Sequence, residues 1–467
     1  MPRLILAALA GAVLTATTPS SFNDVDRYLD QFIDRTVSPR DDFFHYAVGK
    51  WLREHPIPKS ERSWGVANVI QEETYQRLLG ISTAAASAKG MSGINQQKIG
   101  DFWYAAMDTA NIASQGFAWL DSEFARISAV KDLNSLATEV ARLQYVGVGA
   151  LYGNFIMQDE KNSDRYAVHL YQGGLGLPDR DYYFDTDERA VLLRREYVAH
   201  IGRMLNLLGE VSTAATAHAK TIMAIETELA RVSRKLEDLR DPIKNYNAMS
   251  LADVGTLTPS IRWREHLADG KVTGVDTVVV GQPEFFQQVE KSLHAHSIDD
   301  WKTYLRWQLA NAYAAEAGGR FDAEHFHFFG TILNGQLEQR PRWKRMLDEE
   351  EAYLGDALGQ RYVARYFSPG TKQRYEKLTN EIFDAFADRI RNLTWMSQPT
   401  KDRALVKLAA VTKKVGYPTK WKDYTSYAVD RRSFLGNAVR GNIRSSTAAR
   451  RGSLPSTTSM SLSARCT

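Results

Sequence analysis

Ten histidines are the residues of this sequence best suited to metal-dependent chemistry. A zinc hydrolase centre on one helix uses H-E-x-x-H, in which two His one turn apart bind the metal and the Glu activates a bound water. None of the ten His is followed by Glu within residues 1–467. We therefore assign no catalytic residue, no metal ligand and no cofactor to this chain, and its substrate-binding residues stay unknown. The histidines are His45, His55, His169, His200, His218, His266, His294, His296, His325 and His327.

Two His-x-His pairs are the alternatives for a metal site: His294 with His296, and His325 with His327. On a strand this spacing places both rings on one face, whereas on a helix it points them apart. His325 and His327 also lie in an aromatic-rich run, where packing against a core is the ordinary role. We expect neither pair to bind zinc.

Nucleophilic and phosphate-binding patterns are also missing from the sequence. There is no G-x-S-x-G elbow and no Gly-rich phosphate loop. The only cysteine is Cys466, so no intrachain disulfide can form.

Three charged clusters could take part in catalysis or ligand binding, but for each we favour a structural role. Asp41 and Asp42 are expected to cap a helix or form an ion pair rather than act as an acid or metal pair. Residues 179–181 (Asp-Arg-Asp) beside two Tyr are expected to form a buried, ion-paired turn. The basic residues around Trp343 are expected to form a solvated face with a buried aromatic, rather than an anion site. These basic residues are Arg340, Arg342, Lys344 and Arg345.

The elements that would position these residues are mostly helical, because apolar residues recur at spacings of three and four. In residues 222–229 the apolar positions would leave Glu226 and Glu228 facing away from the core. Pro399 is expected to separate two helices. The apolar stripes consist of Tyr375, Leu378, Ile382, Phe386 and Ile390; of Ile222, Ile225 and Leu229; of Leu136, Val140 and Leu143; and of Leu405, Leu408 and Val411.

One segment indicates β structure. Residues 151–156 and 166–171 are rich in aromatic and β-branched residues, and the polar run Lys161-Asn162-Ser163-Asp164 lies between them. This pattern predicts a β-hairpin near residues 151–171. A chain of 467 residues exceeds the size of one hydrophobic core. We therefore expect a mostly α, multi-helix body with two lobes and this small hairpin.

The positive net charge of +4 is unevenly distributed. Seven Arg and no acidic residue follow Asp430, so residues 431–467 carry +7 and the rest carries −3. The basic pI therefore gives no reason to expect nucleic-acid binding by the body. Residues 442–467 contain seven Ser and four Thr and lack aromatic residues, which predicts a disordered basic tail. A frameshift would explain its abrupt start; a natural Ser/Thr-rich tail is the alternative.

The N-terminal residues have the pattern of a signal peptide. Arg3 precedes an apolar stretch from Leu4 to Leu14, and small residues follow up to Pro19. Eleven apolar residues are too few to span a bilayer core of about 30 Å. We expect residues 1–19 to direct export to a bacterial periplasm or the exterior, since an exported protein without disulfides fits a bacterial setting. A frayed apolar terminus is the alternative.

Four ordered motifs carry a resemblance to a known family. They lie in residues 38–65 (SPRDDFFHYAVGKWLREHPIPKSERSWG), 174–184 (GLGLPDRDYYF), 321–367 and 395–421. In this order they resemble the neprilysin, endothelin-converting enzyme and bacterial oligopeptidase O family of zinc metallopeptidases. The third motif contains Arg340-Pro341-Arg342-Trp343, Leu354-Gly355 and Tyr362-Val363, and the fourth contains Trp395-Met396 and Val415-Gly416-Tyr417-Pro418 with Trp421.

The chain lacks the motifs that carry the catalytic chemistry of that family. The family's H-E-x-x-H, its E-x-x-x-D segment and its N-A-[YF]-Y substrate strand follow the region that this chain matches. Asn311-Ala312-Tyr313 is followed by Ala314 and precedes the third motif, so we regard it as a coincidence. Arg40 stands where relatives often have Cys or Gly, which fits a member without disulfides.

The resemblance implies a function for residues 38–421. They would form the helical domain that covers the catalytic domain and admits short peptides, with zinc present in intact relatives. We expect this chain to be a truncated, inactive homologue that self-associates through the face that would contact the missing domain. There Phe43, Phe44, Trp51 and Trp64 are expected to lose burial. The alternatives are a peptide-binding or interaction module, and one half of a split metallopeptidase.

Overall fold

A computed structural model describes residues 27–88 and 93–453 of the chain, with side chains described up to residue 447. It divides the chain into two units, residues 1–69 and residues 70–467, and each is considered by itself. The predicted signal peptide, residues 1–19, lies outside the described residues. Among the helices that are described, none combines the length and apolar character needed to cross a membrane.

The first unit contains helix α2 (Phe43–Glu54), which carries the start of the first motif. Asp42 caps this helix by accepting a hydrogen bond from the His45 backbone N–H at 3.0 Å, so the capping role predicted for the acidic pair is confirmed. Trp51 is buried and stacks on His55 at a centroid distance of 4.6 Å. Phe43 and Phe44 are exposed, as expected, whereas Trp51 is not.

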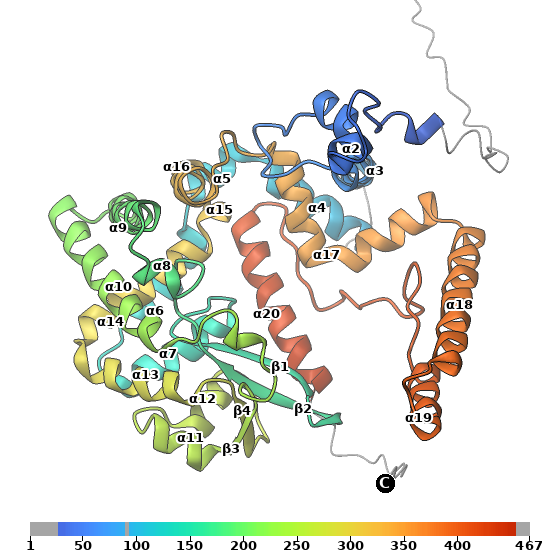
Figure 1. Cartoon of the computed structure of the whole chain (residues 1–467). Helices are drawn as coiled ribbons and strands as arrows, with labels where there is room; N and C mark the ends of the chain where they lie inside the picture. Colours follow the sequence, from blue (N-terminus) through green and yellow to red (C-terminus); the bar gives the residue numbers. More distant parts are fainter. Residues whose placement is uncertain (1–26, 89–92, 454–467) are drawn as a thin grey trace, which may run out of the picture. The chain divides into compact units, whose positions relative to one another are not determined.

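The second unit is mostly α-helical, as the sequence predicts (Figure 1). Helix α3 begins just before it. The helices are α3 (Val66–Ser87), α4 (Asn95–Met107), α5 (Thr109–Gln115), η1 (Ala118–Leu120), α6 (Asp121–Ser128), α7 (Leu133–Tyr145), α8 (Asp181–Phe184), α9 (Glu188–Leu207), α10 (Ser212–Val232), η2 (Asp238–Arg240), α11 (Leu251–Leu257), α12 (Trp263–Asp269), α13 (Pro283–Ala295), α14 (Ile298–Ala312), α15 (Ala314–Ala317), α16 (Gly319–His325), the π-helix η3 (Phe326–Leu333), α17 (Arg342–Tyr366), α18 (Pro369–Asn392), α19 (Gln398–Ala409) and α20 (Phe434–Ser453).

The predicted hairpin is present but belongs to a larger sheet. Strands β1 (Gly153–Asp159) and β2 (Asn162–Tyr171) are antiparallel, and β2 also pairs in parallel with β4 (Thr277–Val280), which pairs with β3 (Asn247–Ser250). The strand order is β1-β2-β4-β3. The prediction of a turn over residues 161–164 is wrong, because β2 already begins at Asn162. The sequence analysis missed β3 and β4. β4 pairs with β2 across 110 residues and with β3 across 27 to 33 residues, separations that local patterns do not reveal.

Two hydrophobic clusters fill the second unit. The larger contains the apolar stripes of α7 and α10 and the inner residues of β2 and β4. The smaller joins α3, α4, α17 and the segment around Tyr424 and Tyr427. Tyr353 on α17 packs against both clusters. The periodic stripes of α7 and α10 are therefore core, as the sequence indicates.

Helix α20 differs from the sequence prediction at its C-terminal half. Residues 442–453 continue this helix, whereas their composition predicts disorder from residue 442. Leu435, Ala438 and Val439 are buried in the larger cluster, so tertiary burial anchors the first turns of α20. Helix can then propagate through Ala- and Arg-containing residues of adequate propensity. The predicted disorder of residues 454–467 concerns residues outside the described part of the chain.

Candidate docking face

The apolar stripe of α18 is exposed except at its last residue, Ile390, which is partly buried. Its side chains are half exposed to solvent: Tyr375 by 53%, Leu378 by 49%, Ile382 by 48% and Phe386 by 56%. No residue of this 24-residue helix is buried. A helix at the surface of a globular protein ordinarily buries its apolar stripe against the core. This stripe therefore has the character of a contact surface rather than of a core element.

Helix α19 packs beside α18, and polar contacts tie α18 both to α19 and to the segment that follows α19 (Figure 1). Lys372 donates to the Tyr417 carbonyl at 3.1 Å, Lys413 donates to Asn380 Oδ1 at 2.6 Å, and Lys401 donates to the Arg391 carbonyl at 2.9 Å. Pro399 lies in the first turn of α19, seven residues beyond Asn392, the last residue of α18, so its predicted position between two helices is confirmed. Large apolar side chains stay exposed here too, with Trp395 and Val406 the most prominent.

Residues of the third and fourth motifs meet at a pocket of about 270 Å³. Its walls come from α3, α17 and residues 416–421, and Glu351 is its only charged lining residue. Gly416 has a φ of +70°, and a Cβ there would lie 3.0 Å from the Phe367 ring, which explains the glycine of the motif. Such a pocket can accept an apolar side chain. It offers neither a metal-ligand set nor a nucleophile.

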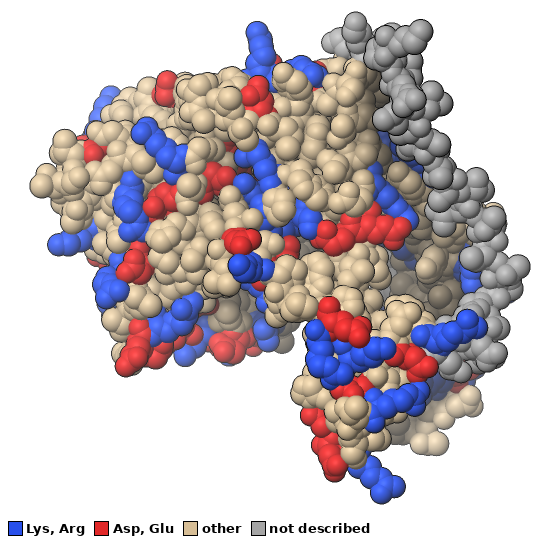
Figure 2. Space-filling view, turned by 90° about the horizontal axis from the view of Figure 1, so that it is seen from above, with Lys and Arg blue, Asp and Glu red and all other residues tan. Residues whose placement is uncertain are grey.

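The docking face, defined here as residues 369–422, is basic as well as apolar. These residues include twelve Lys or Arg and five Asp or Glu, which gives a net charge of +7. On the molecular face seen in Figure 2, Lys and Arg are interspersed with Asp and Glu, and no continuous basic patch appears. A partner of the docking face should therefore be apolar at its centre and acidic around it.

The turn at residues 179–181 is only half-buried, and it is structural. Asp179 Oδ1 accepts the Asp181 backbone N–H at 2.8 Å, and Arg180 approaches Asp181 at 3.9 Å. The expected ion-paired turn is thus present, although less buried than expected.

Glu226 anchors this motif from inside the larger core, where sequence periodicity had placed it facing away. It is fully buried, and it accepts hydrogen bonds from the Tyr183 hydroxyl at 2.7 Å and the Tyr197 hydroxyl at 3.0 Å. Burial raises its pKa to about 7. A Cβ at Gly176 would lie 1.8 Å from the Tyr197 hydroxyl, so the motif needs glycine at this position. The prediction that Glu226 faces away is wrong because tyrosines of two other elements supply its partners.

The basic residues around Trp343 also differ from expectation. They are half-buried and engaged rather than a solvated face. Arg340 binds Asp348 at 2.8 Å, Arg345 binds Asp322 at 3.1 Å, and Arg342 donates to the Ala106 carbonyl at 2.7 Å. Lys344 pairs with Glu72. They tie α17 to α3, α4 and α16, which explains the motif without an anion ligand.

The paired histidines have separate partners. His294 contacts Glu290 at 3.0 Å, whereas His296 contacts Glu228 at 3.1 Å on another helix. His325 packs on Phe329, and burial lowers its pKa to about 4. Within residues 27–88 and 93–453, no group of three or more His, Cys, Asp or Glu is arranged to hold a metal ion.

Comparison with known proteins identifies the family. Residues 39–418 match the N-terminal sequence model of peptidase family M13. The chain belongs to peptidase family M13. The match takes in most of all four motifs, so the resemblance drawn from them is confirmed.

Curated M13 relatives are about twice as long as the matched part of this chain. Endothelin-converting enzyme-like 1 of Rattus norvegicus is 27% identical over 85% of this chain, which is 53% of that protein. Neprilysin-3 of Drosophila melanogaster is 24% identical over 83% of this chain, which is 51% of that protein. The chain thus spans about half the length of the curated relatives it matches.

Solved M13 structures share this fold. The Mycobacterium tuberculosis zinc metalloprotease Zmp1 in complex with an inhibitor is 33% identical, with a TM-score of 0.84 over 91% of this chain and 64% of that chain. The same protease in an open state and a partial open state matches with TM-scores of 0.78 and 0.73. PepO of Lactobacillus rhamnosis, at 18% identity and a TM-score of 0.77, shows the fold alone.

Proposed function

We propose that residues 39–418 form the non-catalytic portion of an M13 zinc metalloendopeptidase, which encloses peptide substrates while the zinc centre is supplied by polypeptide outside residues 1–467. The observation that carries this proposal is the exposed stripe of α18. A 24-residue amphipathic helix without a buried residue calls for a partner. The relatives have a further half of their length from which that partner can come.

The chain by itself is then an inactive polypeptide. Peptide hydrolysis by a zinc enzyme needs a bound metal with an open coordination position and a group that activates water. The sequence supplies no H-E-x-x-H, and the described residues supply no metal-ligand cluster.

The test combines metal analysis with a peptide cleavage assay. The purified chain, incubated with zinc and desalted, should retain no stoichiometric zinc and should not cleave short peptides. Addition of the zinc-bearing portion of the M. tuberculosis protease should produce a complex. One zinc per chain together with chelator-sensitive cleavage by the chain alone would contradict the proposal.

Charge indicates how that partner is held. The docking face carries +7, so its complex with the zinc-bearing portion should weaken as ionic strength rises. Substituting Ile382→Asp and Phe386→Asp should weaken it at all salt concentrations, because both side chains are half exposed and available for contact. Val191→Asp on α9, where Val191 is 51% exposed, is the matched control.

A further inference from the structure

Helix α9 carries a histidine that lies among residues of the larger hydrophobic cluster. The His200 ring is fully buried, stacks on Phe328 of η3 at a centroid distance of 5.0 Å and meets Trp307 of α14 edge to face at 5.5 Å. Its Nδ1 lies 2.8 Å from Glu324 Oε1, whereas within the described part of the chain its buried Nε2 has no hydrogen-bond partner. The neutral ring with its proton on Nδ1 fits this position. A second proton, on Nε2, would be buried without an acceptor, which costs free energy.

A second histidine lies close to the first. His325, the last residue of α16, packs on Phe329 at a centroid distance of 4.6 Å, and Phe329 also meets the His200 ring at 5.5 Å. Burial lowers the pKa of both histidines, that of His325 to about 4, and His200 lowers the pKa of His325 further because two like charges would repel. Both rings are therefore neutral at neutral pH and resist protonation while they stay packed.

The charged groups around this pair do not compensate a positive charge on the rings. Glu324 and Asp322 of α16 favour protonation, but each is already bound by an arginine. Arg203 binds Glu324 at 2.8 Å, and Arg345 binds Asp322 at 3.1 Å. Arg203 and His327 oppose protonation of His200. The pair can gain protons readily only where water reaches it, which requires α16 and η3 to separate from α9.

Helix η3 depends on its neighbours for its shape. It is a π-helix of eight residues, whereas π-helical turns ordinarily occur singly inside α-helices. Helix α9 holds it at two places. His200 stacks on Phe328, and Arg189 donates to the carbonyls of Ile332 and Leu333 at 3.0 and 3.1 Å. Because most helical stability in proteins comes from tertiary packing, loss of the contact with α9 would release η3.

We propose that His200 and His325 form an acid-sensitive switch that releases α16 and η3 from α9. A solvated imidazole takes up a proton near its ordinary pKa of about 6.5, so acid favours the released form. The packed form therefore has its full stability above about pH 6.5 and loses it as the pH falls towards about 4. Release exposes the apolar side chains of η3 to solvent. The switch uses no residue of the docking face.

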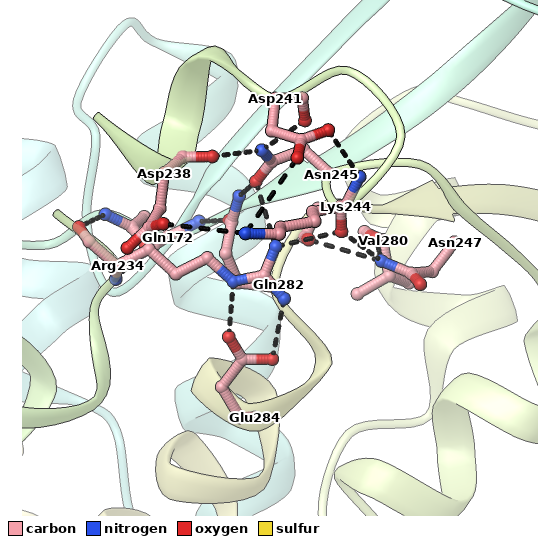
Figure 3. A network of polar contacts seen from close by, with 11 residues as sticks. Gln172, Arg234, Asp238, Asp241, Lys244, Asn245, Asn247, Val280, Gln282 and Glu284 are labelled. Atoms are coloured by element: carbon pink, nitrogen blue, oxygen red, sulfur yellow. Dashed lines mark hydrogen bonds and ion pairs between the residues drawn. The ribbon is translucent and has the colours of Figure 1, made fainter. Parts of the chain in front are cut away.

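Hydrogen exchange of the full chain, corrected for the intrinsic effect of pH on exchange, tests the switch. Opening that takes up two protons should raise the opening equilibrium constant of residues 322–333 more than about tenfold per pH unit as the pH falls from about 6 to about 5. Residues 233–246 are the internal reference. Arg234 holds this loop by binding Glu284 at 2.6 Å and donating to the Lys244 carbonyl at 2.9 Å, and the loop contains no histidine (Figure 3). Its opening should change less than about twofold per pH unit.

Substitutions assign the response to the two histidines. His325→Gln leaves one titrating group, as does His200→Phe, which keeps a ring against Phe328. Either variant should reduce the response to about tenfold per pH unit or less, because only one proton is taken up. The doubly substituted chain should show no response. His294→Gln on α13, whose side chain is 63% exposed, is the matched control and should keep the full response.

Three results would overturn the switch. The first is an opening constant of residues 322–333 that changes less than about twofold per pH unit. The second is a response that His325→Gln leaves unchanged. The third is exchange in α10 that rises in parallel, because the acid would then unfold the whole core. The first and third results are measured on the unchanged chain, so a His200→Phe variant that fails to fold leaves the test intact.

Discussion

At the scale of single residues, Glu226 makes the stability of the fold depend on pH. Its carboxyl group lies in the larger core, where two tyrosine hydroxyls and Gln308 donate to it. Burial raises its pKa from 4.5 to about 7, which means that the folded state holds its proton more tightly than the unfolded state. The contribution of this residue to stability is therefore complete below pH 4.5 and declines as the pH rises to about 7.

We expect Glu226→Gln to remove this pH dependence. Between pH 4.5 and 7 the unfolding free energy of the natural chain should fall, relative to that of the variant, by up to about 3 kcal/mol. Above pH 8 the difference in unfolding free energy between the natural chain and the variant should be constant. Urea unfolding at intervals of half a pH unit measures it. A difference that stays constant from pH 4.5 to 8 would contradict the assignment.

At the scale of elements, a buried lysine helps to hold the segment between α19 and α20. Lys98 of α4, 4% exposed, donates from Nζ to the Tyr427 carbonyl at 2.9 Å and the Thr425 carbonyl at 3.3 Å, and it also reaches the Tyr424 carbonyl. Tyr424 and Tyr427 belong to the smaller cluster. This side chain therefore fixes the path by which the chain leaves the docking face.

Replacing Lys98 by Met should lower the unfolding free energy by about 3 kcal/mol, since charged hydrogen bonds are lost and buried carbonyls are left without a donor. Hydrogen exchange should increase first at residues 424–428. Lys377→Met, on the exposed side of α18, is the control and should change the unfolding free energy by less than about 0.5 kcal/mol. Equal effects of the two substitutions would refute the anchoring role.

The docking face predicts how the isolated chain behaves in solution. Its apolar stripe favours self-association, whereas its charge of +7 opposes contact between two copies of the same face. Self-association should therefore increase with salt concentration, which light scattering measures. Ile382→Asp with Phe386→Asp should keep the chain monomeric at high salt. Association that weakens with salt would point to contact of this face with an acidic surface on the second copy.

At the scale of the whole molecule, stability should depend on the zinc-bearing portion. A partner that binds only the folded chain adds about 2.7 kcal/mol when its concentration is one hundred times its Kd. The melting temperature of the chain should therefore rise when that portion of the M. tuberculosis protease is added. An unchanged melting temperature, at a partner concentration shown to saturate binding, would favour a self-sufficient interaction module.

The sequence by itself determined the family, the mostly α character and the lack of H-E-x-x-H. Ordered motifs identify a family because each preserves a local requirement, such as the small side chain of Gly176 beside Tyr197 or the positive φ of Gly416. The apolar stripes of α7, α10 and α18 could be predicted because apolar residues spaced three and four apart lie on one face of a helix. Helix and hairpin depend on neighbours in sequence, so local patterns suffice to predict them.

Only the tertiary structure decided what those faces meet. The same periodicity marks the stripe of α10, which is buried, and that of α18, which is not. Glu226 is turned inward because Tyr183 and Tyr197 come from elsewhere in the chain, and β3 and β4 pair across separations that no local pattern reports. Local spacing fixes which residues share a face, but burial is a property of distant segments that pack together.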